Sequence, residues 1–239
     1  MATAQIKLRS RTLLLATLLL ATLLPGVAPA AALAVVPFSR PTLERTLEGL
    51  APDANPRVLR LAAKALDCVT DRAHRLAVID YSLPSNQPRL WVFDLLRGRL
   101  LFEERVAHGR GSGDAQPHAF SNVPESHQSS LGLFRTLDSY RGRNGYSLRL
   151  EGLEPGVNDR AFDRAIVVHG ADYASPAFVA RTGRLGRSHG CPVVRPEVTR
   201  PLIDSIKGGQ YLFAYYPDPH WLQTSSFLGC SADARLARN

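Results

Sequence analysis

The chain has 239 residues, a formal net charge of +8 and only three cysteines, and 45% of its residues are hydrophobic. This length is sufficient for one well-cored domain, alone or with a small appendage. Beyond the N-terminal region no segment is apolar enough to cross a membrane, and nucleic acid is not an expected partner.

The first 34 residues have the layout of an export signal. Basic residues precede an apolar run of twelve residues from Leu13 to Leu24, and small residues follow. A membrane span needs about 20 apolar residues, which disfavours an uncleaved anchor. We predict a signal peptide over 1–34, cleavage after Ala34, no stable membrane insertion of the mature chain, and secretion to the periplasm or cell wall. The remaining positive charge suits an anionic wall polymer, or a solvated basic surface.

Two helices are predicted over Pro41–Leu50 and Asn55–His74. Asn55 is a suitable N-cap, and apolar residues recur at helical spacing after it. The resulting N-terminal helical segment, 35–75, would cover a sheet or dock onto the functional site.

Short runs rich in β-forming residues follow over 76–217, separated by glycine, proline and other turn residues. We predict a mainly antiparallel β-domain, a sandwich or open barrel, with one more helix over Pro196–Lys207. The residues 218–239 form a C-terminal tail. The predicted strand sequences are LAVIDYS, LWVFDL, LLFEERVAHG, LGLFRT, YSLRLEGLE, AIVVHG and QYLFAYY.

Three cysteines in an oxidising compartment leave at least one unpaired. Cys68 and Cys230 lie outside any motif and are predicted to bridge the N-terminal region to the tail. Cys191 would then be the free thiol, in the stretch GRSHGCPVV.

A thiol becomes a useful nucleophile as thiolate, which requires a nearby base. His169 ends the predicted strand AIVVHG, where a rigid scaffold presents a side chain, so it is a better base than His189. Backbone N–H groups around Gly190 and Cys191 are suitably placed for a developing oxyanion. A turn built from Gly190 and the following proline is the alternative interpretation.

His169-Gly170 followed by Ser188-His189-Gly190-Cys191 resembles the signature of the L,D-transpeptidases of peptidoglycan, which have the YkuD-type fold. The surrounding patterns resemble the murein L,D-transpeptidase catalytic domain subgroup across residues 76–216. These patterns are VAHGRGSG, AFSNVPES, SSLGLFRT, HGADY and GRLGRSHGCPVV.

The resemblance implies a YkuD-like catalytic domain over 76–217 that forms a thioester between Cys191 and a peptidoglycan stem peptide at an L-centre. His169 would act as base, oriented by the carbonyl of Gly170. N–H groups near His189, Gly190 and Cys191 would hold the oxyanion, Ser188 completes the motif, and an acceptor amine would resolve the thioester. It implies no cofactor, and inhibition by carbapenems.

Two positions depart from the family pattern. His169 is followed by Gly170 rather than Ser, which leaves the backbone carbonyl but no hydroxyl. Val193 stands where members commonly have Arg or Asn, so Arg187 or Arg195 would have to anchor the substrate. The substrate-binding candidates are Arg187, Tyr173, Asn122 and Ser130. No metal site is predicted, because the spacing of the nearby His, Asp and Cys residues matches no metal-binding pattern.

Two alternatives stay open at this point. The same Cys-His site would serve an L,D-carboxypeptidase or endopeptidase if water resolved the thioester. A non-catalytic wall-binding module would instead use Cys191 structurally.

Overall fold

The computed structural model describes residues 1–2, 39–71 and 73–230. Almost all of the predicted signal peptide, and the last nine residues of the tail, therefore lie outside the described residues. The elements are α1 (Arg40–Leu50), α2 (Pro56–Asp67), β1 (Arg75–Asp80), β2 (Leu90–Asp94), β3 (Arg99–Glu104), β4 (Gly132–Gly142), β5 (Gly145–Gly152), β6 (Val167–Gly170), η1 (Asp172–Ala174), α3 (Pro176–Thr182), β7 (Val193–Val194), α4 (Pro196–Ile206), β8 (Tyr211–Tyr215) and α5 (Pro219–Thr224).

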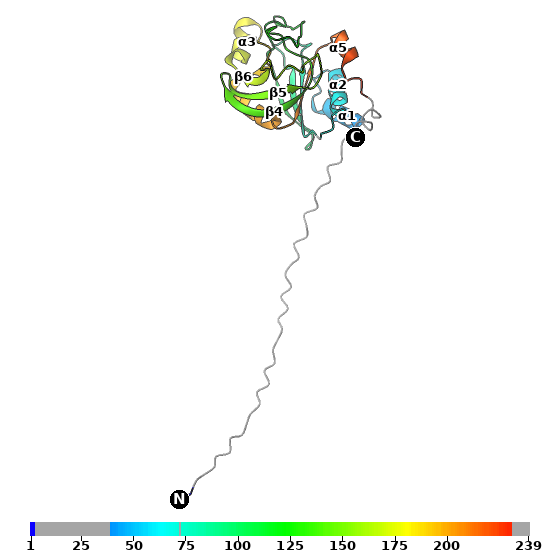
Figure 1. Ribbon diagram of the computed structural model, residues 1–239. Helices are drawn as coiled ribbons and strands as arrows, with labels where there is room; N and C mark the ends of the chain where they lie inside the picture. The colour runs from blue at the N-terminus through cyan, green and yellow to red at the C-terminus, as the bar shows by residue number, and fades with distance from the viewer. Residues whose placement is uncertain (3–38, 72, 231–239) are drawn as a thin grey trace. The chain divides into compact units, whose positions relative to one another are not determined.

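All strands belong to one sheet with the order β3-β2-β1-β8-β4-β5-β6-β7. Its pairs are antiparallel except β1 with β8 and β6 with β7, which are parallel. The segment that follows β3 turns back onto the other edge, where Ala107 and Val193 exchange backbone hydrogen bonds of 2.8 and 3.3 Å. The sheet is thus an almost closed barrel, and the predicted mainly β fold is confirmed (Figure 1).

The central strands explain why the barrel forms where it does. Every residue of β2 and β8 is buried, as are all residues of β1 after Arg75. Strands buried on both faces appear in a sequence as continuous apolar runs. The helix α2 packs against β1 and β8, while α4 packs against β1, β4, β5 and β6.

The predicted N-terminal helices form, but the second is shorter than expected. Asn55 caps α2 by accepting a hydrogen bond from the Arg57 N–H at 2.9 Å. The helix ends at Asp67 instead of His74; the Cys68 N–H bonds to the Ala65 carbonyl at 3.1 Å, and Cys68 is joined to Cys230 by a disulfide. The predicted pairing is therefore confirmed, and Cys191 is free. The helical hairpin covers β1 and β8 and lies away from β6 and α3 (Figure 1).

Several short elements were not predicted. The region 171–187, for which no helix or strand was predicted, contains η1 and α3, and α5 interrupts the predicted tail. The two-residue strand β7 lies inside the cysteine motif. Among the described residues, no helix combines the length and apolar character needed to cross a membrane.

Candidate active site

The short strand β7 brings the predicted nucleophile beside the predicted base. His169 in β6 is paired with Val193 in β7, two residues after Cys191, and with Ser147 in β5. The parallel β6–β7 register therefore fixes the cysteine segment next to His169. His169 and Cys191 are 22 residues apart in the sequence. The strand pairing makes the AIVVHG and CPVV segments neighbours.

The opposite side of the cysteine segment is held by the chain that follows β3. The Ser188 N–H donates to the His108 carbonyl at 2.9 Å, and the Arg110 N–H donates to the Ser188 carbonyl at 2.8 Å. His108 itself is fully buried, and its Nδ1 accepts a hydrogen bond from buried Arg89 at 2.8 Å. Burial, together with the Arg89 charge, lowers the pKa of His108 to about 3, so this ring stays neutral.

Internal hydrogen bonds shape the turn that carries the cysteine. The Ser188 hydroxyl donates to the Cys191 carbonyl at 2.7 Å and accepts from the Gly190 N–H at 3.1 Å. Gly190 has a φ of +120°, and a Cβ there would lie 2.7 Å from a methyl carbon of Ile166. Only glycine fits this backbone, so its role is to permit the turn rather than to leave space for substrate.

One of the predicted oxyanion donors has a hydrogen-bond partner inside the turn. The Gly190 N–H is already used by Ser188, so it is not available to a substrate oxygen. The N–H groups of His189 and Cys191 have no acceptor within the described chain, and they are the remaining candidates. The His189 ring is exposed and stacks on His127, with ring centroids 4.4 Å apart.

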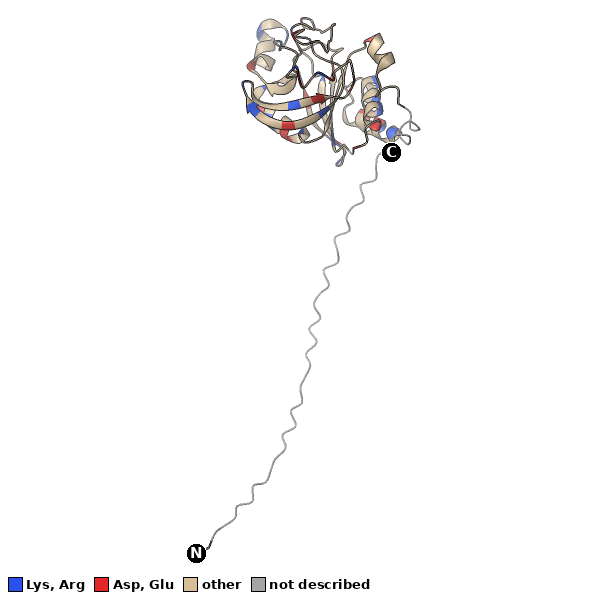
Figure 2. Ribbon diagram, viewed as in Figure 1, with Lys and Arg blue, Asp and Glu red and all other residues tan. Residues whose placement is uncertain are grey.

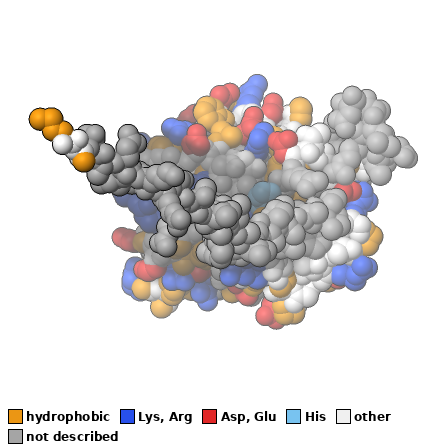
Figure 3. Space-filling model, turned by 90° about the horizontal axis from the view of Figure 1, so that it is seen from below, with side chains coloured by type: hydrophobic (Ala, Val, Ile, Leu, Met, Phe, Trp, Pro, Cys, Tyr) orange, Lys and Arg blue, Asp and Glu red, His pale blue; other side chains and the backbone are white. Residues whose placement is uncertain are grey.

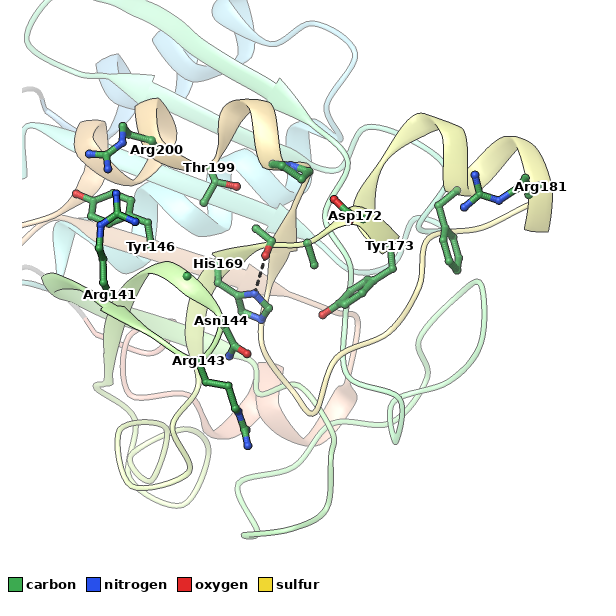
Figure 4. Close-up of a pocket in the computed structure, with 15 residues that line it drawn as sticks. Arg141, Arg143, Asn144, Tyr146, His169, Asp172, Tyr173, Arg181, Thr199 and Arg200 are labelled. Carbon is green, nitrogen blue, oxygen red and sulfur yellow. Dashed lines mark hydrogen bonds between the residues drawn. The ribbon is translucent and has the colours of Figure 1, made fainter.

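His169 is fixed in the tautomer that a base requires. Its Nδ1 donates to the Gly170 carbonyl at 3.1 Å, which leaves Nε2 as the basic nitrogen (Figure 4). The ring is 5% exposed, and burial lowers its pKa even though the Gly170 carbonyl opposes that effect. Gly170 cannot be replaced without movement, because a Cβ there would collide with the Thr199 hydroxyl of α4.

Cys191 is buried and protonated in this arrangement. Its thiol donates to the Ala165 carbonyl at 3.6 Å and accepts from the Val167 N–H at 3.5 Å. Burial raises the pKa of Cys191, whereas the Val167 N–H and the positive charge of Arg164 lower it. The thiol makes no hydrogen bond to the His169 ring in the described chain, although both residues line one cavity of about 720 Å³.

Arg164 is the cation that sequence reasoning missed. Its guanidinium donates to the carbonyls of Ser121 and Gln128 at 2.6 Å each and to the Ser130 hydroxyl at 2.7 Å. It also lines the cavity around Cys191. Nothing in the surrounding NDRAFDRA sequence distinguishes this arginine from an exposed one.

The arginines expected to act in place of Val193 are engaged elsewhere. Arg195 forms a bidentate pair with Glu104, at 2.7 and 2.9 Å, and does not line the cavity. Arg187 does line the cavity, but its guanidinium donates to the Gly113 carbonyl at 3.1 Å and pairs with Asp114 at 3.3 Å.

The other predicted substrate contacts separate into two groups. Tyr173 lines the cavity. Burial, and to a smaller extent the nearby Cys191, raises the pKa of its hydroxyl to about 12. Asn122 and Ser130 do not line it. Asn122 donates to Asp159 at 2.7 Å, and the Ser130 hydroxyl donates to the Ser121 carbonyl at 2.8 Å, so both stabilise the neighbouring loop.

Comparison with known proteins places this site within a known family. A family model described as an L,D-transpeptidase catalytic domain matches residues 50–215. No curated protein matches the chain.

Solved structures with a similar arrangement include an L,D-transpeptidase from Mycobacterium smegmatis, with 16% identity, 60% of this chain and 59% of that chain covered, and a TM-score of 0.39. An LD transpeptidase in complex with imipenem has 15% identity, 59% of each chain covered and a TM-score of 0.37. The helical cell shape determining protein Pgp2 from Campylobacter jejuni has 10% identity, 62% and 49% coverage, and a TM-score of 0.41. The chain thus spans about half to three fifths of the length of these proteins.

Proposed function

The chain belongs to the family of L,D-transpeptidase catalytic domains, and from this premise we propose that it transfers peptidoglycan stem peptides through a thioester on Cys191. One observation carries the proposal: a free, buried cysteine, Cys191, lines the same cavity as His169. The Nδ1 of this histidine donates a hydrogen bond to the Gly170 carbonyl. This is the arrangement of an activated nucleophile, a base and a group that orients the base.

The first half-reaction begins with a neutral Cys191 thiol and a neutral His169 imidazole. When a stem peptide enters, the Cys191 thiol turns from the Ala165 carbonyl towards His169 and gives its proton to Nε2. The sulfur attacks the carbonyl carbon of an L-centre, and the N–H groups of His189 and Cys191 stabilise the oxyanion. The C–N bond then breaks, and the leaving D-alanine amine takes the proton from His169.

The second half-reaction resolves the thioester. An acceptor amine attacks the thioester carbonyl, the C–S bond breaks, and the proton lost by the amine returns through His169 to the sulfur. The energy of the original peptide bond is conserved in the thioester, so no nucleotide is required. Water in place of the amine would give the L,D-carboxypeptidase or endopeptidase reaction from the same site.

We also infer that the protein is exported to the periplasm or cell wall. The leader-like sequence over 1–34 and the Cys68–Cys230 disulfide support this, since structural disulfides persist in oxidising compartments. A mature chain that begins near Val35 would retain every helix and strand of the described fold.

The test is mass spectrometry of the products formed from a disaccharide-tetrapeptide. Wild-type protein lacking residues 1–34 is compared with the Cys191→Ala variant and with an EDTA-treated sample. Dimers that lack one D-alanine, formed by the wild type with or without EDTA and absent for Cys191→Ala, are the expected result. Tripeptide alone would assign the carboxypeptidase reaction.

Incubation with a carbapenem gives an independent readout of the thiol. We expect intact-mass analysis to show one added inhibitor on wild type and none on Cys191→Ala. If the wild type neither reacts with the inhibitor nor changes tetrapeptides or intact sacculi, the catalytic proposal is wrong and the wall-binding alternative stands.

A further inference from the structure

A second cavity adjoins His169 and is unusually rich in arginine. It has a volume of about 920 Å³ and shares His169, Tyr173, Arg143 and Asn144 with the cavity around Cys191. We call it the arginine cavity, after the four arginines that line it. These are Arg141, Arg143, Arg181 and Arg200, supplied by the β4–β5 hairpin, α3 and α4 (Figure 4).

None of the four arginines forms an ion pair within the described chain, although the Arg200 charge contributes to lowering the pKa of the Asp204 carboxyl. The only acidic residue that lines the cavity is Asp172. Arginines nearby behave differently, since Arg195 pairs with Glu104 and Arg184 with Asp114. Figure 2 shows blue at the tip of the β4–β5 hairpin and on α3, whereas charges of both signs are interspersed on the face seen in Figure 3. The cavity is therefore a local concentration of positive charge.

Two of these guanidinium groups are held against aromatic rings. Arg200 lies over the Tyr146 ring at 4.5 Å, and Arg181 lies over the Phe178 ring at 5.6 Å. Stacking occupies the flat faces of a guanidinium and leaves the in-plane N–H donors for an anion. Planar guanidinium groups bind carboxylates with paired hydrogen bonds, so these two arginines are suited to a carboxylate-bearing ligand.

The position of His169 shows what kind of ligand the cavity would receive. His169 lines both cavities, whereas Cys191 lines only the smaller one. A donor peptide must reach the Cys191 sulfur and therefore occupies the smaller cavity. A molecule in the arginine cavity can give a proton to His169 while the thioester is in place, as an acceptor amine must do.

We propose that the arginine cavity is a subsite that recognises the carboxylates of the acceptor stem peptide and directs its amine towards His169. The inference rests on the transpeptidase function proposed above. In the step concerned, the amine nitrogen bonds to the thioester carbon, the C–S bond breaks, and the amine proton passes to His169 and then to the Cys191 sulfur.

The experiment separates acylation from transfer. Acylation of the wild-type protein by a carbapenem is recorded by intact mass, and transfer from a tetrapeptide donor is followed as a function of acceptor concentration. Two acceptors are compared, one with free carboxylates and one with the same carboxylates amidated. We expect amidation to raise the acceptor KM of the wild type about tenfold, since it removes a charge-assisted hydrogen-bond acceptor.

Variants of the arginine cavity test whether the cavity causes this difference in acceptor KM. The double variant Arg181→Gln/Arg200→Gln should raise the KM for the free-carboxylate acceptor about tenfold and should change the KM for the amidated acceptor little. Arg45→Gln, an exposed arginine of α1, is the matched control and should retain the wild-type ratio. A ratio unchanged by the double variant, with normal acylation, would overturn the subsite and leave the proposed function standing. Absence of acylation in wild type would instead contradict the proposed function itself.

Discussion

The two ends of the barrel use cysteine in opposite ways. At one end, Cys68 follows α2 and is joined to Cys230 after α5, across 162 residues of sequence. At the other end, Cys191 is free, and its thiol contacts the Val167 N–H of β6 and the Ala165 carbonyl. Two sulfurs join the helical hairpin to the segment after α5, and the third is an unpaired, buried thiol.

The difference shows how one chain separates stability from reactivity. The disulfide needs only that two cysteines meet in a suitable geometry. The free thiol needs burial, which raises its pKa and keeps it protonated and unreactive until a base engages it. Changes at one end should therefore leave the property of the other end intact. The predictions below test this separation, from the largest effect on the reactivity of the Cys191 thiol to the smallest.

Removing the base should have the largest effect. His169→Gln lacks a group that can accept the thiol proton, so we expect the acylation rate to fall by about 10²-fold or more. The rate is measured by intact mass with a carbapenem, and the unfolding midpoint is measured in parallel. The control is His74→Gln, which changes an exposed histidine directly before β1. This variant should be acylated at the wild-type rate.

The pH dependence of the acylation rate should be that of a site in which the Cys191 thiol and the His169 imidazole are both neutral before reaction. The pKa of His169 is lowered from 6.5 and that of Cys191 is raised from 9.0, so both groups are neutral at pH 7. The rate should fall as pH drops through the lowered pKa of His169, below 6.5, and should rise above pH 9 as thiolate forms. A rate that declines above pH 8 would indicate a thiolate–imidazolium pair and contradict this assignment.

The same titration has a consequence for stability. The folded-state pKa of His169 lies below its unfolded value, so the unfolded chain binds more protons in the interval between them. His169 thus contributes stability that is present above pH 6.5 and is lost as pH falls through its folded pKa. His108 acts in the same direction, with its folded pKa near 3.

Loss of the Arg164 charge should have an intermediate effect. Arg164→Gln removes the nearby positive charge that favours the thiolate, so the pKa of Cys191 should rise. Alkylation of the thiol at neutral pH should then slow about tenfold if that pKa rises by about one pH unit, because the thiolate fraction falls by the same factor. Arg164→Lys retains the charge and should recover part of the rate if charge matters more than the loop hydrogen bonds. Arg160→Gln, exposed on the same loop, should match wild type. An unaltered thiol pKa in Arg164→Gln would remove Arg164 from the mechanism.

Removal of the disulfide should have the smallest effect on acylation. Cys68→Ser/Cys230→Ser removes a cross-link that restricts the unfolded chain. Loss of such a disulfide typically lowers the free energy of unfolding by about 2–5 kcal/mol. Thermal unfolding should report that loss while carbapenem acylation of Cys191 continues at the wild-type rate. Thiol titration of the unfolded, unreduced protein should find one free thiol, and three would contradict the pairing.

Local patterns were sufficient for the parts of the fold that local physics controls. The α2 N-cap at Asn55, the buried runs of β1, β2 and β8, and α4 with its terminating glycines all follow from turn chemistry and periodicity. The predicted extent of α2 was wrong: the helix ends at Asp67, and the residues from there to His74 include no glycine or proline that would mark this end. The short strand β7 was missed since two residues carry no periodicity.

The sequence by itself determined that at least one of the three cysteines is unpaired, favoured Cys191 for that position, and predicted that His169 lies at the end of a strand. Only the tertiary structure decided how they meet, since the β6–β7 register and the segment after β3 fix the cysteine turn from both sides. It also decided that the Gly190 N–H donates to Ser188, that Arg164 supplies the nearby cation, and that four arginines with no ion pair among the described residues share a cavity with His169. These features depend on distances between residues far apart in the chain, which no local pattern encodes.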